Sequence, residues 1–255
     1  MRIVSLCPSL TELVFDLGRG ADLVAATDWC VHPVDGVAGV EKIGGTKTPR
    51  VARIVELAPD LVLMNEEENR VEDADALRAA GVSLHVSMPR DAAATAQMVR
   101  SIAAAVERAP EGERIAADIE ARTRRVVAAA ANARRVRWAY LIWRKPYMSV
   151  NADTFASALL DQAGGANIFA ARAERYPEID MAELGALAPE VVLLCTEPFP
   201  FQDKHREELA QLTGLASGRF VIADGELLSW HGSRTPRGID YAESLIVAAR
   251  GNPTA

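Results

Sequence analysis

The chain has 255 residues, of which 49% are hydrophobic and 25% are charged, the balance of a folded globular protein. Its formal net charge of −7 is the opposite of the basic excess that a nucleic-acid-binding surface needs, so we expect no nucleic-acid partner. No apolar run approaches the roughly 20 residues that span a bilayer, which excludes a membrane-spanning protein.

The start of the chain and its cysteines bear on the cellular compartment. Met1 and Arg2 lead directly into a strand pattern, without the basic, apolar and small-residue regions of a secretion signal. Either the protein stays in the cytoplasm or its export signal is not part of this numbering. Cys7, Cys30 and Cys195 are too few and too widely spaced for a disulfide framework, which favours a reducing compartment.

Short apolar runs alternate with helical patterns along most of the chain. The spacing of Ser9 and Glu12 matches a capping box and predicts a helix that ends before Gly18. Thr48 before Pro49 predicts another helix start, and Asp180 begins a third. The predicted strands cover residues 3–6, 23–26, 61–64, 84–86, 137–142, 191–195 and 220–223. This alternation predicts an α/β fold with parallel sheets and helices on both faces.

Two features predict a pair of lobes. Residues 51–64 and 181–194 share a pattern in which a helix ends in Leu-Ala-Pro-acid and leads into an apolar strand. Chance reuse of a common turn is possible, but duplicated architecture explains the match better. Residues 111–133 are rich in Ala and Arg and predict a rigid helix over residues 113–131, near 30 Å long. We therefore predict α/β lobes at residues 1–105 and 135–255, joined by a helical segment at 106–134.

Aromatic residues gather in the loops that follow the predicted strands, where α/β sheets bind ligands. They pack beneath the loops or form the walls of a site for a flat, bulky ligand, and sequence alone leaves both options open. Their arrival from both lobes favours a shared cleft. The residues concerned are Trp29, Trp143, Tyr147, Phe199, Phe201 and Trp230.

The sequence gives weaker support for metal binding or catalysis. Cys7, Cys30, His32 and His231 lack the spacing of a metal site, and no nucleophile elbow is present. We therefore predict no metal site and no catalytic residue. The first strand is followed by Cys7, Pro8 and Ser9 rather than by a glycine-rich phosphate loop, so nucleotide binding is unsupported.

Six segments in chain order resemble the class III periplasmic binding proteins, also called helical backbone metal receptors. The resemblance is closest to the vitamin B12 receptors of ABC transporters, and it covers nearly the whole chain. The matching segments are residues 5–13, 27–33, 44–46, 56–63, 164–169 and 230–237. The family's architecture of two α/β lobes bridged by one long helix agrees with the predicted lobes and helix.

The resemblance implies a non-enzymatic solute receptor that passes a metal chelate to the permease of an ABC-type importer. Family members bind corrinoids such as cobalamin, haem, ferric siderophores or bare metal ions, and three tryptophans in the matching loops suit a corrinoid in the cleft between the lobes. The resemblance implies a periplasmic or other extracytoplasmic location, whereas the missing signal leaves a cytoplasmic chaperone or enzyme using Cys7, Cys30 and His32 as the alternative. We expect a monomer without an intrinsic cofactor.

The resemblance also indicates which residues take part. The ligand-contacting residues are predicted to be Cys7, Pro8, Ser9, Trp29, Gly45, Trp143, Tyr147, Phe199, Trp230, His231 and Arg234. Family members dock on the transporter through one surface glutamate in each lobe. Here the candidates are Glu67 or Glu72 in the first lobe and Glu197 or Glu207 in the second.

Overall fold

The structure is a computed structural model that describes residues 1–251. Contacts between residues divide the chain into two compact units. Unit 1 comprises Met1–Pro89, Ala93–Asp118 and His231–Arg234, and unit 2 comprises Arg90–Ala92, Ile119–Trp230 and the chain from Thr235 onward. Residues 231–234 thus group with unit 1, although the sequence analysis placed them in the lobe 135–255.

Unit 1 is built on a five-stranded parallel sheet of order β3-β2-β1-β6-β7. Apolar side chains of β1 and β6 are fully buried, as expected for central strands covered on both faces. The strands are β1 (Ile3–Ser5), β2 (Leu23–Ala26), β3 (Glu41–Lys42), β6 (Leu61–Asn65) and β7 (Leu84–Ser87), and β4 (Gly44–Gly45) forms a separate antiparallel hairpin with β5 (Thr48–Pro49). The helices are α1 (Pro8–Asp16), α2 (Val34–Val37), α3 (Val51–Glu56), α4 (Val71–Ala79) and α5 (Ala92–Ala105), with a 3-10 turn at Gly20–Asp22.

Unit 2 is built on a four-stranded parallel sheet of order β11-β10-β8-β9. Its strands are β8 (Val136–Leu141), β9 (Gly165–Asn167), β10 (Val191–Cys195) and β11 (Phe220–Ala223). Its helices are α7 (Phe155–Gln162), α8 (Met181–Leu187), α9 (Asp203–Thr213), α10 (Gly225–Ser229) and α11 (Thr235–Gly251), with a 3-10 turn at Ser217–Arg219. The two parallel α/β sheets confirm the predicted fold class.

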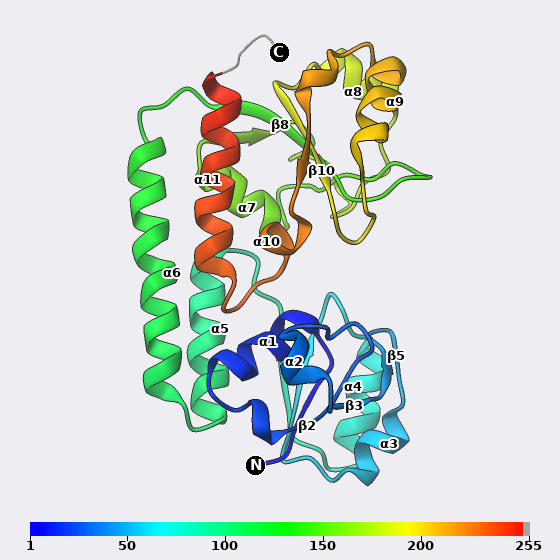
Figure 1. Cartoon of the computed structure of the whole chain (residues 1–255), viewed down its shortest axis with the longest axis vertical. Coiled ribbons are helices and arrows are strands. Elements are labelled where there is room, and N and C mark those ends of the chain that lie inside the picture. The colour runs from blue at the N-terminus through cyan, green and yellow to red at the C-terminus, as the bar shows by residue number, and fades with distance from the viewer. Residues whose placement is uncertain (252–255) are drawn as a thin grey trace. The chain divides into compact units, whose positions relative to one another are not determined.

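One long helix, α6 (Ala109–Ala130), begins in unit 1 and ends in unit 2. It starts one turn before the predicted residue 113 and includes Gly112. A Cβ at Gly112 would collide with the Cβ of Ala103, so glycine permits the close approach of α5. Figure 1 shows α5 beside the first half of α6 and α11 beside its second half. Across residues 1–251, none of the helices combines the length and apolar character that a membrane span requires.

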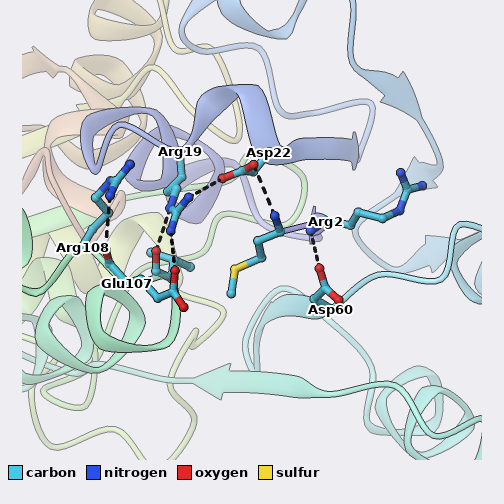
Figure 2. A network of polar contacts seen from close by, with 8 residues as sticks. Arg2, Arg19, Asp22, Asp60, Glu107 and Arg108 are labelled. Atoms are coloured by element: carbon cyan, nitrogen blue, oxygen red, sulfur yellow. Dashed lines mark hydrogen bonds and ion pairs between the residues drawn. The ribbon is translucent and has the colours of Figure 1, made fainter.

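The duplication predicted from the sequence extends to the order of four strands in each unit. In unit 1 the strands run β2-β1-β6-β7, and in unit 2 the equivalent order is β9-β8-β10-β11. Asp60 accepts a hydrogen bond from the backbone N–H of Arg2, as Glu190 does from that of Arg137. Each arginine side chain also donates to a backbone carbonyl at the end of the helix that precedes the carboxylate, α3 for Arg2 and α8 for Arg137. Figure 2 shows the Arg2–Asp60 contact beside the ion pair of Arg19 with Asp22.

Two predicted helix starts are wrong. The side chain of Ser9 does not cap α1, because its hydroxyl faces Cys7 Sγ and His231 Nε2, and the helix begins at Pro8 after an uncapped Cys7. Thr48 and Pro49 form strand β5, and α3 begins only at Val51. The third prediction is confirmed, since Asp180 accepts hydrogen bonds from the first turn of α8.

We expect Ala58→Gly and Ala188→Gly each to raise the free energy of unfolding by roughly 0.5–1 kcal/mol. Both alanines have a φ of 44°, in the left-handed region where a Cβ is unfavourable. Urea denaturation measures the change. The control is Ala128→Gly, at an exposed position inside α6, which should lower the free energy by about 1 kcal/mol. A loss of stability at both turn positions would contradict the duplicated left-handed turn.

Candidate functional site

The segments that follow the parallel strands of unit 1, including the first turn of α1, contain most of the predicted ligand residues of that unit. Residues 7–9 follow β1, residues 27–30 follow β2, and residues 66–69 follow β6. Because β1 lies between β2 and β6 with parallel pairing, these loops leave the same edge of the sheet. Cys7 and Ser9 are buried there, and Pro8 is half-buried.

His231 is bound to that edge by hydrogen bonds. Its Nε2 lies 3.4 Å from Ser9 Oγ and 3.4 Å from Asn65 Nδ2, and the side chain is 8% exposed. Burial lowers the pKa of His231 from 6.5 to about 4, so the imidazole is neutral at pH 7. The Ser9 hydroxyl and the Asn65 amide can both donate a hydrogen bond, which is compatible with a neutral imidazole whose unprotonated Nε2 is the acceptor.

Arg234 is held close by. Its guanidinium donates to the carboxylate of Glu12 in α1, and both side chains are largely buried. Both His231 and Arg234 are predicted from the sequence to contact a ligand and to lie in the lobe 135–255. These hydrogen bonds join them to residues of unit 1 and hold residues 231–234 against α1 and β6.

The buried thiols of Cys7 and Cys30, next to this edge, are held in hydrogen bonds and have raised pKa values. Thr11 Oγ1 lies 3.0 Å from Cys30 Sγ and 3.1 Å from the carbonyl oxygen of Cys7. Burial raises the pKa of Cys7 to about 12 and also raises that of Cys30. Both groups therefore stay protonated at neutral pH, which gives no support to their use as nucleophiles.

Trp29 is the most exposed large ring of the predicted set, with 65% of its surface accessible. Its indole Nε1 would lie 3.6 Å from a Cβ at Gly45, so the ring lies against the β4–β5 hairpin. Gly45 is half-buried beneath it. An exposed indole on a glycine hairpin offers a flat apolar surface to a ligand.

In unit 2 an aromatic cluster follows β8 and β10. Trp143 packs edge-on against Phe199 with ring centroids 5.9 Å apart, and Phe199 packs against Phe201 at 4.7 Å. His205, at the start of α9, contacts both phenylalanines and accepts a hydrogen bond at Nδ1 from Gln202 N. Trp143 remains 41% exposed. A histidine in a charged helix gives no signal of aromatic packing, so only the structure shows this role of His205.

Tyr147 is held by charged neighbours that the sequence did not indicate. Its hydroxyl donates to Glu208 Oε1 at 3.0 Å, and Arg144 Nη2 donates to the same oxygen at 2.6 Å. Arg144 lowers the pKa of Glu208 by this hydrogen bond. Trp230, by contrast, is 9% exposed and belongs to the buried side chains of the protein.

The four candidate docking glutamates differ in their exposure. Glu67 and Glu197 lie in the equivalent loops after β6 and β10, and both are half-buried. Glu72, in α4, and Glu207, in α9, are exposed. Among residues 1–251, no three His, Cys, Asp or Glu side chains are grouped so that they could hold a metal ion.

Comparisons with known proteins agree with this fold. Over 244 residues the chain is 22% identical to the vitamin B12-binding protein of Vibrio cholerae serotype O1, covering 96% of this chain and 87% of the relative. The crystal structure of the periplasmic vitamin B12 binding protein BtuF of Vibrio cholerae matches with a TM-score of 0.85 and 21% identity, covering 98% and 97% of the two chains. The periplasmic heme-binding protein RhuT from Roseiflexus sp. RS-1 matches with a TM-score of 0.83 and 25% identity, covering 99% and 98%.

These relatives are binding proteins rather than enzymes, and they differ in the tetrapyrrole ligand that their names state. The family described as periplasmic binding protein matches residues 3–227, which is most of the sequence. The chain therefore belongs to the periplasmic binding protein family.

Proposed function

We propose that this chain is the solute receptor of an ABC-type importer and that its ligand is a corrinoid such as cobalamin. Membership of the periplasmic binding protein family supports a role in solute binding. The ligand class must be argued from the site, because the relatives include both vitamin B12-binding and heme-binding proteins.

The choice of a corrinoid over haem rests on the protein side chains that could bind the metal ion of the bound molecule. A haem protein supplies an axial side chain such as histidine or tyrosine to the iron. In the predicted site, the Nε2 atom of His231 is engaged by Ser9 and Asn65, and the Tyr147 hydroxyl donates to Glu208. A corrinoid brings four ring nitrogens and can bring its own axial base, so it needs no such residue from the protein.

Exposed indoles then supply the binding surface. Trp29 in unit 1 and Trp143 in unit 2 are the two tryptophans with large accessible area. Burying a ring of this size against a macrocycle removes apolar area worth about 25 cal/mol per Å², or one to a few kcal/mol for each indole.

We expect Trp29→Ala and Trp143→Ala each to weaken cobalamin binding by about 10- to 100-fold with little change in the melting temperature. Isothermal titration calorimetry of the purified chain with cyanocobalamin, cobinamide, hemin and zinc chloride measures the affinities. The control is Val247→Ala, which removes an exposed apolar side chain from α11 and should leave binding unchanged.

The panel also separates the alternatives. Binding of hemin alone, lost in Tyr147→Phe, would replace the corrinoid by haem as the ligand. Binding of zinc alone, lost in His32→Ala or Cys30→Ala, would favour a free-metal receptor. If none of the four probes binds, a receptor for metal chelates is contradicted, and Trp29 has a role in packing rather than in ligand binding.

A further inference from the structure

A continuous set of contacts in unit 1 connects a predicted ligand residue with a predicted docking loop. It begins at Trp29, whose ring lies against Gly45 of the β4–β5 hairpin. The next hairpin residue, Thr46, is buried, and its carbonyl oxygen accepts a hydrogen bond from Asn69 Nδ2 at 3.0 Å. Asn69 directly follows the acidic loop, residues 66–68.

A second contact joins the same two segments. Lys47, at the tip of the hairpin, donates from Nζ to the carbonyl oxygen of Glu67 at 2.6 Å. Burial raises the pKa of Glu68, and the nearby Lys47 charge opposes that shift. The hairpin and the acidic loop are thus held together by hydrogen bonds from the side chains of Asn69 and Lys47 to backbone carbonyls, and by charge.

Asn69 is the residue on which these contacts converge. Its side chain is 6% exposed, and its amide nitrogen donates both to Thr46 O and to Leu6 O at 3.0 Å. Its amide oxygen accepts from the backbone N–H of Asn65 at 2.8 Å. One side chain therefore ties the hairpin, the end of β1 and the end of β6 together.

Asn65 extends the connection into the acidic loop. Its Oδ1 accepts the backbone N–H groups of Glu67 at 3.0 Å and Glu68 at 3.2 Å, which fixes the turn of that loop. A displacement of the hairpin moves Thr46 O, which accepts a hydrogen bond from Asn69. Because Asn69 is bonded to Asn65, and Asn65 to the backbone N–H of Glu67, the turn that contains Glu67 moves with it.

We propose that the β4–β5 hairpin transmits ligand contact at Trp29 to the acidic loop of residues 66–68, with Asn69 as the positioning residue. This inference rests on the proposed function. A ligand that presses on Trp29 orders the hairpin, and the loop that carries Glu67 becomes more rigid. The receptor surface that meets the permease would then differ between the loaded and the empty protein, a coupling that linkage makes reciprocal.

Hydrogen exchange followed by mass spectrometry tests the coupling on the whole chain without any permease. Peptides that contain the amides of Glu67 and Glu68 report on the acidic loop, because both N–H groups are bonded to Asn65. With saturating cyanocobalamin we expect their exchange to slow by about fivefold or more. In Asn69→Asp, which keeps the acceptor oxygen and loses both donations, the affinity for cyanocobalamin should persist while the slowing disappears.

Asn167→Asp is the matched control. Asn167 is a buried asparagine of unit 2 whose amide nitrogen donates to Val150 O and Ser157 Oγ and whose amide oxygen accepts from the backbone N–H of Phe169. A general loss of packing would therefore affect this variant equally. This variant should keep the full slowing at residues 66–68.

A ligand-free comparison makes the test independent of the ligand. Trp29→Ala should speed exchange of the same amides in the wild-type background but not in Asn69→Asp. Unchanged exchange at residues 66–68 on cyanocobalamin saturation, or slowing that survives in Asn69→Asp, would overturn the coupling while leaving the proposed function intact. If calorimetry shows that neither cyanocobalamin nor hemin binds, the proposed function fails. In that case, unchanged hydrogen exchange at residues 66–68 in Trp29→Ala overturns the coupling independently.

Discussion

When the pH is lowered from 7 to 4, the free energy of unfolding is expected to fall by about 3 kcal/mol more in the wild-type protein than in the His231→Gln variant. The unfolded chain protonates this imidazole near pH 6.5, whereas burial lowers the pKa in the folded protein to about 4. Between these values the unfolded state binds more protons, so acid favours unfolding. Each tenfold change in the proton-binding equilibrium is worth about 1.4 kcal/mol, and the folded imidazole is half protonated at pH 4, so the loss between pH 7 and pH 4 is about 3 kcal/mol.

The contribution of His231 is fully present above pH 6.5 and is lost as the pH falls toward 4. Urea denaturation at a series of pH values measures it as the difference in slope between the two proteins. Carboxylates such as Glu41 and Glu208, whose pKa values are lowered by arginine partners, contribute equally to both curves and cancel in the difference.

His85→Gln provides the comparison for this experiment. Burial also lowers the pKa of His85, but the side chain is half-buried at the edge strand β7, so its share of the acid sensitivity should be smaller. Parallel curves for wild type and His231→Gln between pH 6.5 and 4 would contradict a neutral, buried His231.

The second large effect is expected at the docking surfaces. Replacing Glu67 and Glu197 together by lysine should weaken binding to the importer's permease by about 100-fold, since each change turns an attraction to a basic partner into a repulsion. Both residues lie in loops after equivalent strands, 130 positions apart in the duplicated pattern. Cobalamin affinity and melting temperature should stay close to those of the wild type.

Binding of the loaded receptor to the permease in lipid nanodiscs, measured by biolayer interferometry at several salt concentrations, tests this prediction. The loss should be largest at low salt because exposed charges are screened at high salt. The Glu72→Lys, Glu207→Lys pair tests the alternative assignment with the same total charge change. If neither pair alters the binding, docking through one glutamate of each lobe is wrong.

The broad architecture could be predicted because its signals are local. A buried parallel strand such as β10 is a short apolar run, and the turn at Ala188 recurs at Ala58 with the same φ. The strands predicted at residues 191–195 and 220–223 therefore coincide with β10 and β11. The two-residue strands β3, β4 and β5 gave no signal, since periodicity needs a longer run.

The helix starts show where local signals fail. Ser9 and Glu12 have the spacing of a capping box, yet each has a tertiary partner distant in the chain, His231 for the hydroxyl and Arg234 for the carboxylate. Asp180 directs its carboxylate to the backbone N–H groups of Ala182 and Glu183 and caps α8 as predicted. Whether a polar side chain caps its own helix depends on what else approaches it.

By itself, the sequence determined the α/β class, the duplicated helix-to-strand pattern and the placement of most of the aromatic side chains in loops after strands, because each depends on residues that are neighbours in the chain. Only the tertiary structure decided the chemical state of the site. Burial makes the imidazole of His231 neutral at pH 7, and two groups that contact its Nε2, Ser9 and Asn65, are 222 and 166 positions away in the chain. Hydrogen bonds and desolvation act through space, so a pattern along the chain contains no record of which distant groups will surround a side chain.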